Sequence, residues 1–221
     1  MKIKKAVIPA AGLGTRVLPA SKSMPKEMLP IVDKPAIQYI VEEAVKSGIE
    51  DILIITSRGK TTVEDHFDRN PELEAKLLAS KKQEVYDQMV AISQMANIQY
   101  VRQKETKGLG HAVLCAKAFA GNEPFAVLYG DDVVLGGEKP ACCELCEAYE
   151  KYGVGVAGIK PVATENISKY CSVALEPIPD EQAVYRLTDM VEKPSLTEVL
   201  SNYSILGRVV LPPEIFPILE N

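Results

Sequence analysis

The sequence contains no long uninterrupted run of apolar residues. A membrane-spanning helix requires roughly 18 such residues in a row, and no segment of the 221-residue chain approaches that length. The basic start, Met1 to Lys5, leads into only a few apolar residues before Pro9. A secretory signal peptide needs a longer apolar core. We therefore predict a cytoplasmic protein that makes no use of a membrane.

Cysteine is sparse, and its placement indicates no disulfide framework. The chain has five cysteines, an odd number, and nothing in its composition resembles a small secreted protein. Cys143 and Cys146 have the spacing of a metal knuckle, but no second Cys or His pair lies nearby. Residues 141–149 instead have the pattern of an amphipathic helix, with Cys142 and Cys146 on one face. We predict that these thiols are buried in the core.

Neither composition nor net charge is extreme, but the charge is unevenly distributed. Apolar residues make up 47% and charged residues 25%, which is typical of a globular protein and excludes disorder, collagen-like repeats and a coiled coil. The net charge is −5, yet residues 1–34 hold seven basic and two acidic side chains. Such a chain is unsuited to binding nucleic acid over a broad surface. The basic segment favours either a small anionic ligand or a solvated edge, and charge alone leaves both open.

Strand-like and helical patterns alternate as far as residue 152. Predicted strands cover Lys5–Pro9, Asp51–Thr56, Ile98–Val101 and Phe125–Tyr129; predicted helices run from Pro35 to a stop at Gly48, over 61–96 with a break at Pro71, over 110–120 and over 140–152. This repetition predicts right-handed βαβ units and a mostly parallel sheet between two layers of helices. Strand-like segments at 154–162, 170–176, 184–192 and 204–211 then indicate antiparallel additions. We predict a single α/β domain, 1–221, with a Rossmann-like mixed sheet.

The loop after the first predicted strand has the features of a phosphate-binding loop. Ligands of open parallel sheets bind beyond the carboxyl ends of the strands. There the chain reads Ala10–Arg16, in which Gly12 and Gly14 let backbone N–H groups approach a phosphate and Arg16 adds a bidentate donor. The loop matches neither a Walker A motif nor the dinucleotide fingerprint. A plain glycine-rich turn would explain the glycines alone, whereas Arg16 and the next segment favour a functional site.

Three further segments carry candidate binding residues. Pro25 and Pro30 bracket Lys26 and Glu27 in a stiff, non-helical stretch that suits a phosphate contact, although any single lysine is more often simply solvated. Gln103 precedes Lys107–Gly110 at a helix start, which suits base or anion binding or a simple loop and cap. Gly130–Asp132 follows a predicted strand. Its two adjacent carboxylates suit Mg²⁺, and a plain Gly-Asp turn is the alternative.

Together these segments resemble the nucleotidyltransferases that activate sugar 1-phosphates, and within that family the bacterial uridylyl branch. The resemblance extends over nearly the whole chain and rests on Ala10–Arg16, Pro25–Pro30, Asp33–Tyr39, Arg102–Ala112, Gly130–Asp132, Val191–Pro194 and Ser201–Arg208. It implies transfer of UMP from UTP to glucose 1-phosphate (EC 2.7.7.9), giving UDP-glucose and pyrophosphate by in-line attack at the α-phosphate. It also implies Mg²⁺ as cofactor and a homo-oligomer for the full-length family.

The resemblance also assigns roles to individual residues. On the nucleotide side it implies that the nucleoside is held by Ala11, Gly12, Glu27, Gln103 and Gly108, the triphosphate by Arg16 and Lys26, and magnesium by Asp131. On the sugar side it implies that Glu192 binds the glucose hydroxyls, Lys193 the sugar phosphate, and Asn202 and Gly207 the rest of the sugar. The catalytic set is then Arg16, Lys26, Asp131 and Lys193. Nucleotide binding falls to about residues 1–135 and sugar binding to about 136–221.

This reaction explains why the chain needs no catalytic histidine. A sugar 1-phosphate is already largely dianionic at neutral pH, because its second pKa is about 6. It needs no general base, so catalysis consists of positioning and charge neutralisation. We expect His66 to be a helix residue on the protein surface, and His111 to lie in the first turn of its helix.

Some residues depart from the family pattern. Tyr170-Cys171 replaces the usual Tyr-Gly, and Tyr203-Ser204 replaces the usual Leu-Ala, both in the sugar-binding part. Family members continue past the position of Asn221 with a segment that supplies a second metal carboxylate. From this we expect the 221-residue chain to bind UTP, to turn over poorly and to self-associate.

Three other functions compete with the uridylyl assignment. A sister enzyme would use dTTP or CTP, since base choice depends on a few contacts. A non-catalytic paralogue would bind nucleotide without turnover. A glycosyltransferase would share the sheet and an acidic metal motif, but it needs a general base and has no use for Arg16 and Lys26.

Overall fold

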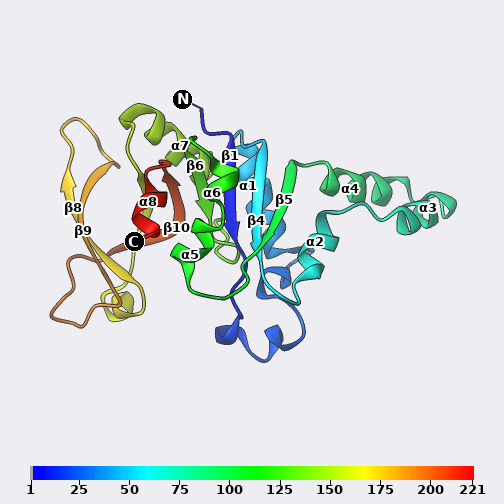
Figure 1. The fold of residues 1–221 in the computed structure, drawn as a ribbon, viewed down its shortest axis with the longest axis horizontal. Coiled ribbons are helices and arrows are strands. Elements are labelled where there is room, and N and C mark those ends of the chain that lie inside the picture. The colour runs from blue at the N-terminus through cyan, green and yellow to red at the C-terminus, as the bar shows by residue number, and fades with distance from the viewer. Residues whose placement is uncertain (1) are drawn as a thin grey trace. The chain divides into compact units, whose positions relative to one another are not determined.

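The computed structural model describes residues 2–221, and the contacts within it divide them into two compact units (Figure 1). The first unit comprises the described residues as far as Val156 together with Val209–Asn221. The second unit is Ala157–Arg208. No helix among residues 2–221 has the length and apolar character needed to cross a membrane.

A sheet of mostly parallel strands forms the centre of the first unit. Strands β1 (Lys5–Pro9), β4 (Asp51–Thr56), β5 (Asn97–Arg102) and β6 (Phe125–Leu128) lie in the order β5-β4-β1-β6. The strand order continues with β10 (Tyr203–Leu211) and β7 (Val156–Pro161), whose residues are divided between the two units. Strand β1 pairs in parallel with both neighbours, so that Val7 lies opposite Leu53 on one side and Val127 on the other. The predicted positions of these strands are confirmed. The continuous apolar runs of β1, β4 and β6 are buried on both faces, as expected for central parallel strands, whereas the edge strand β5 has only exposed and partly buried residues.

Helices cover both faces of this sheet, which confirms the three-layer α/β prediction. One core cluster joins alternate strand residues to α1 (Ala36–Lys46), α2 (Thr61–Phe67) and α7 (Ala141–Tyr152). The other joins the opposite strand residues to α5 (Leu109–Leu114), α6 (Lys117–Ala120) and α8 (Ile215–Leu219). In the second cluster Phe216 stacks on Phe125, with 5.4 Å between ring centroids. Cys142 and Cys146 are buried in the first cluster, as predicted.

Two predicted helical segments are interrupted. The segment 61–96 contains α2, α3 (Pro71–Ala79) and α4 (Gln83–Ser93), and the last two extend as a pair beyond the β5 edge (Figure 1). Pro71 is the first residue of α3 and not only a break in the helical pattern. Asn70 caps α3, because its side chain accepts a hydrogen bond from Leu73 N at 3.0 Å. The segment 110–120 is split into α5 and α6.

Irregular chain connects β1 to α1 and carries most of the predicted phosphate-binding residues. It contains three short 3₁₀ helices, η1 (Thr15–Val17), η2 (Ala20–Lys22) and η3 (Lys26–Met28), and a small ribbon made of β2 (Pro30–Ile31) and β3 (Lys34–Pro35). Because no long helix or strand holds this stretch, side-chain contacts help to fix it.

The second unit is largely antiparallel. Strands β8 (Cys171–Pro177) and β9 (Tyr185–Glu192) pair antiparallel with an irregularity between Ala174 and Leu175, and η4 (Thr164–Lys169) precedes them. The predicted strands are therefore present, but β8 and β9 form a two-stranded sheet of their own.

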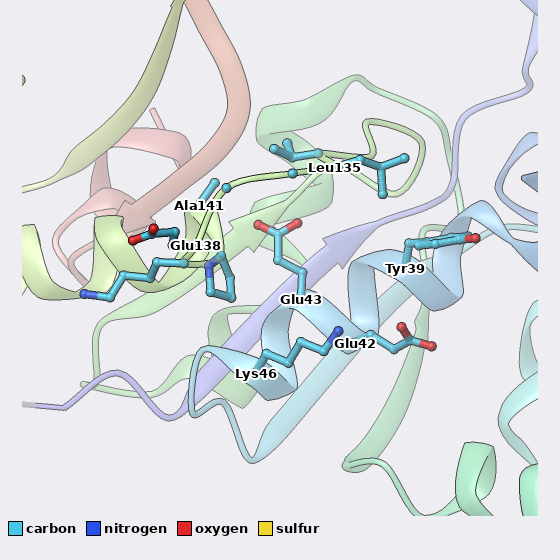
Figure 2. Close-up of a pocket in the computed structure, with 12 residues that line it drawn as sticks. Tyr39, Glu42, Glu43, Lys46, Leu135, Glu138 and Ala141 are labelled. Carbon is cyan, nitrogen blue, oxygen red and sulfur yellow. The ribbon is translucent and has the colours of Figure 1, made fainter.

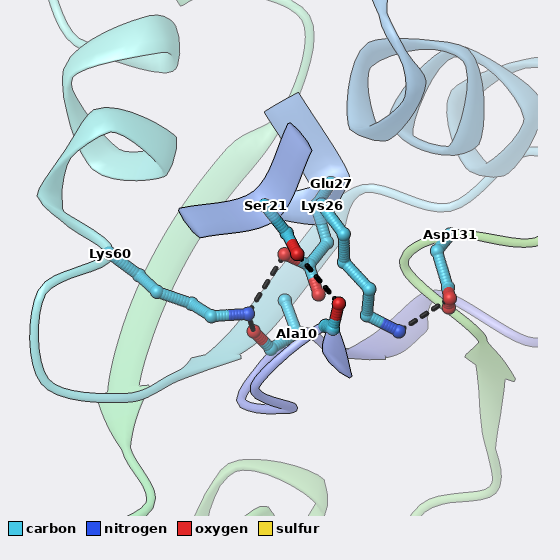
Figure 3. Close-up of polar contacts among 7 residues, drawn as sticks. Ala10, Ser21, Lys26, Glu27, Lys60 and Asp131 are labelled. Carbon is cyan, nitrogen blue, oxygen red and sulfur yellow. Dashed lines mark hydrogen bonds and ion pairs between the residues drawn. The ribbon is translucent and has the colours of Figure 1, made fainter. Parts of the chain in front are cut away.

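A buried ion pair ties the irregular stretch to the sheet. Lys60 Nζ lies 2.8 Å from Glu27 Oε2 and also donates to the backbone oxygen of Ala10 (Figure 3). Glu27 is 0% exposed and Lys60 7%. Glu27 lies in η3, Lys60 at the start of α2 and Ala10 directly after β1, so one ammonium group joins three segments.

Burial opposes both charges of this pair. It raises the pKa of Glu27 and lowers the pKa of Lys60, while each partner's charge acts in the opposite direction. Glu27 Oε1 is buried without a hydrogen-bond partner among the described residues. The carboxylate therefore depends on Lys60 for its neutralisation.

Replacing Lys60 by Met should lower the free energy of unfolding by about 3–5 kcal/mol, because it leaves a buried carboxylate without its partner. Urea unfolding at pH 7 measures the change. Lys76→Met, on the exposed face of α3, is the matched control and should change the free energy by less than about 0.5 kcal/mol. The double variant Glu27→Leu/Lys60→Met should recover much of the loss, since no buried charge then stands alone.

The loss in Lys60→Met should depend on pH. Without Lys60, burial is the main influence on Glu27 and holds its folded-state pKa above the unfolded value. The variant should then be most stable below the ordinary carboxyl pKa and lose stability as pH rises through the raised pKa. A deficit of the same size at pH 4 and pH 8 would contradict this account.

Candidate functional site

The loop after β1 packs closely against η2 and η3. Gly14 has φ +69°, and a Cβ there would lie 3.1 Å from Ser21 Cβ and 3.3 Å from Lys26 Cβ. Only glycine fits this combination of backbone and space. Gly12 is exposed, and a Cβ on it would lie 3.8 Å from Lys26 Cε. The loop backbone at Gly12 therefore lies beside the end of the Lys26 side chain, as expected for two parts of one anion site.

Lys26 also reaches the end of β6. Its Nζ pairs with Asp131 Oδ2, 105 residues further along the chain (Figure 3). Gly130 permits this approach, because a Cβ there would lie 3.1 Å from Pro9 O and 3.3 Å from Glu27 Cγ. The Asp131 side chain is 45% exposed, so one of its faces is open to solvent. The structure thus brings together Gly12, Lys26 and Asp131 at the carboxyl ends of β1 and β6.

A third part of the site follows β5. The backbone N–H of Gln103 donates to Thr56 O at 2.8 Å, and its buried side chain turns toward the start of α5. Gln103 Nε2 donates to Gly108 O at 3.2 Å and lies 2.8 Å from His111 Nδ1. Gly108 has φ +92°, a conformation that favours glycine. Of the remaining nucleotide-side residues, Ala11 is buried beside the loop and Arg16 is exposed in η1.

The predicted sugar-binding residues all lie in the second unit. Lys193 has φ +49°, and its N–H donates to Tyr170 O at 2.8 Å, which fixes the turn after β9. Its Nζ lies 3.9 Å from Glu192 Oε1, and both side chains are exposed. Asn202 Nδ2 donates to Thr164 Oγ1 at 3.1 Å, and Gly207 is buried with φ +73°. The sugar roles of these residues stay predictions.

The two departures from the family pattern contact each other inside this unit. Cys171 Sγ lies 3.2 Å from Ser204 Oγ, and both residues are buried. Ile205 N also donates to Cys171 Sγ at 3.4 Å. The two substitutions therefore form one packed pair.

Sequence reasoning missed Lys60 and misjudged His66. A single lysine after a strand is expected in solvent, and the only available signal for Lys60 was its place beyond the carboxyl end of β4, the same edge as the other site residues. His66 is half-buried rather than on the surface, because α2 packs it against α1, with Nε2 3.0 Å from Gln38 Oε1. Burial lowers the pKa of His66. His111 lies in the first turn of α5, as predicted.

A separate polar cavity of about 340 Å³ lies between α1 and residues 134–141 (Figure 2). Tyr39, Glu42, Glu43 and Lys46 line it from the helix. Glu43 is buried there because it accepts a hydrogen bond from Cys142 N at 3.1 Å, at the start of α7. None of the predicted site residues is among those that line this cavity.

Comparison with known proteins shows the family of the chain. The family model described as nucleotidyl transferase matches residues 5–221. The chain is 56% identical to UTP–glucose-1-phosphate uridylyltransferase YngB of Bacillus subtilis (strain 168), over 99% of this chain and 73% of that protein. It is 53% identical to the UTP–glucose-1-phosphate uridylyltransferase of Staphylococcus epidermidis (strain ATCC 12228), over 99% of this chain and 75% of that one.

Solved structures give the same result. The UTP-bound UGPase of Acinetobacter baumannii superimposes with a TM-score of 0.93 at 42% identity, over 99% of this chain and 78% of that one. A UDP-glucose pyrophosphorylase complexed with UDP-glucose gives a TM-score of 0.87 at 44% identity, over 99% and 80% of the two chains. The family model, the sequence identities and the structural similarity agree, and the chain belongs to the nucleotidyl transferase family.

Proposed function

We propose that this chain transfers UMP from UTP to glucose 1-phosphate, giving UDP-glucose and pyrophosphate. The observation that carries the proposal is the meeting of the Gly12 backbone, Lys26 and Asp131 at one sheet edge, in a chain 52–56% identical to curated uridylyltransferases. Relatives described with UTP and with UDP-glucose bound support the choice of nucleotide and sugar. A cytoplasmic location and a homo-oligomeric assembly stay predictions from the sequence.

The reaction joins two anions, and the residues suit that task. An oxygen of the sugar phosphate attacks the α-phosphorus of UTP in line, and the bond to the bridging oxygen of pyrophosphate breaks. The attacking group is already ionised, so no proton has to be removed. Lys26 and Arg16 hold the triphosphate and neutralise its charge. Glu192 holds the glucose hydroxyls, Lys193 the phosphate of the sugar, and Asn202 and Gly207 the rest of the sugar. Ala11, Gly12, Gln103 and Gly108 hold the nucleoside, and the predicted role of Glu27 is indirect, because this residue is fully buried against Lys60.

The residues at the end of β6 fit a magnesium ion. Asp131 offers a hard, half-exposed carboxylate in contact with the lysine that would hold phosphate. Within residues 2–221 no three His, Cys, Asp or Glu side chains are grouped to hold a metal. The Asp131 carboxylate beside Lys26 suits Mg²⁺, which binds one or two carboxylates and takes its remaining ligands from phosphate and water. When bound, Mg²⁺ supplies neutralisation of phosphate charge, and Asp131 is the residue that holds it.

Pyrophosphate release tests the proposal directly. The purified chain with glucose 1-phosphate and Mg²⁺ should release pyrophosphate faster with UTP than with dTTP, CTP or ATP. A clear preference for dTTP or CTP would identify a sister enzyme. Tight UTP binding by calorimetry without any turnover would identify a non-catalytic paralogue.

Lys26→Ala and Arg16→Ala should each reduce kcat/KM about 10²-fold or more, because charge developing at the phosphates loses a partner. Both side chains lie outside the core, and the Lys26–Asp131 pair is partly exposed, so melting temperatures should change little. Lys22→Ala, which removes an exposed lysine of η2, is the matched control and should keep normal activity. Near-normal kcat/KM in Lys26→Ala would refute its role.

Asp131→Asn should raise the Mg²⁺ concentration needed for half-maximal activity, in addition to slowing the reaction, because a neutral amide oxygen binds a hard cation less well. A magnesium titration of initial rates at saturating UTP measures the shift. Lys26→Ala serves as the comparison, since it should lower the rate and leave the carboxylate in place. An unchanged magnesium dependence in Asp131→Asn would move the ligand elsewhere, first to Asp132.

A further inference from the structure

The ammonium group of Lys26 lies between the two parts of the site that would bind charged ligands. Its Nζ pairs with Asp131 Oδ2, on the carboxylate that suits Mg²⁺ (Figure 3). A Cβ on Gly12 would lie 3.9 Å from the same Nζ, so the glycine-rich loop runs beside the end of the lysine. One ammonium group therefore borders both the carboxylate that would hold a metal and the backbone that would hold a phosphate.

The backbone of Lys26 is held in place, whereas the end of its side chain is free to turn. The next residue, Glu27, is anchored by its buried ion pair with Lys60. Lys26 Cβ packs against the turn at Gly14, where a Cβ would lie 3.3 Å away. The Lys26 side chain is 22% exposed and that of Asp131 45%, so their contact borders solvent. Rotation about the outer bonds of the lysine can turn the ammonium group from the carboxylate toward the loop while the backbone stays fixed.

A metal ion and this ammonium group compete for one carboxylate. Mg²⁺ approaches a carboxylate oxygen to about 2.0–2.1 Å and would repel an ammonium group bonded to the same carboxylate. A bound triphosphate removes the conflict, because its oxygens at the loop offer the ammonium group a partner of higher charge than Asp131.

We propose that Lys26 is the internal counter-ion of Asp131 and lowers its affinity for Mg²⁺ until a triphosphate draws the ammonium group away. Nucleotide binding then completes the metal site of the protein. The coupling is reciprocal, so Asp131 also holds Lys26 back from a metal-free triphosphate. The inference rests on the proposed function, in which Lys26 contacts phosphate and Asp131 the metal, and adds the exchange between them.

Metal binding in the absence of nucleotide tests the first half of the exchange. Mn²⁺ prefers the same oxygen ligands as Mg²⁺, and EPR spectroscopy follows its free concentration. Lys26→Met removes the ammonium group and keeps most of the aliphatic stem. The affinity for Mn²⁺ should rise about 5-fold, the size expected for a partly exposed ion pair. Adding Asp131→Asn to this variant should abolish the gain.

Lys22→Met is the matched control, because it removes an exposed lysine of η2 that lies outside the pair. It should change the affinity for Mn²⁺ less than about 2-fold, since solvent and salt screen such a charge. If Lys26→Met does not keep the wild-type melting temperature, Lys26→Gln takes its place.

UTP binding without metal tests the second half of the exchange. Calorimetry in EDTA compares the wild type, Asp131→Asn, Lys26→Met and the double variant. Asp131→Asn releases the ammonium group and should raise the affinity for UTP about 5-fold. In the Lys26→Met background the same substitution should change the affinity less than about 2-fold, because the pair is already broken. A gain of equal size in both backgrounds would mean that Asp131 only repels the phosphates, and it would overturn the exchange.

The outcomes separate the inference from the proposed function. If both binding tests give the expected changes and the wild type releases no pyrophosphate, the exchange is supported and the catalytic function is overturned. An unchanged affinity for Mn²⁺ in a folded Lys26→Met variant overturns the inference, whatever the turnover.

Discussion

The ion pair between Glu27 and Lys60 is the contact on which the nucleotide side of the structure depends. The stretch from Ala10 to Ile31 contains only short 3₁₀ helices and the short strand β2, and it carries the loop glycines and Lys26. Lys60 links it at two points, through the Ala10 carbonyl and the Glu27 carboxylate. Taking both charges out of water is unfavourable, so such a pair contributes little net stability. The pair instead fixes positions. If η3 moved away from Lys60, the buried Glu27 carboxylate would lose its partner.

The parallel sheet explains why so few residues suffice for the site. Carboxyl ends of neighbouring parallel strands meet at one edge, so residues as distant in sequence as Lys26 and Asp131 come together without a dedicated scaffold. Gly14 and Gly130 then remove the side-chain bulk that would keep the segments apart. Neither histidine of the chain is needed for proton transfer, and each instead contacts a glutamine, His66 with Gln38 and His111 with Gln103.

Much of the fold was predictable because buried strands and amphipathic helices leave strong patterns in the sequence. The bounds of β1 and β4 follow directly from continuous apolar runs. The site segments were recognisable because glycines, prolines and charged residues follow strand ends. Lys60 was not, since a buried lysine looks like any other until its partner Glu27 is known to be buried as well. The isolated pairing of β8 with β9 was equally hidden, because local pattern predicts a strand and not its neighbour.

In the proposed function, phosphate binding and base selection impose different physical demands and fall to different residues. Every nucleoside triphosphate carries the same phosphates, so Lys26 and Asp131 gain no discrimination from being rigid, and both are partly exposed. A base is recognised by where its hydrogens lie, which requires a group whose donor and acceptor cannot exchange places. Gln103 suits that requirement because it is buried and its Nε2 donates to the carbonyl of Gly108, which can only accept. In the proposed function, base selection therefore falls to the buried Gln103, and charge neutralisation to the partly exposed Lys26 and Asp131.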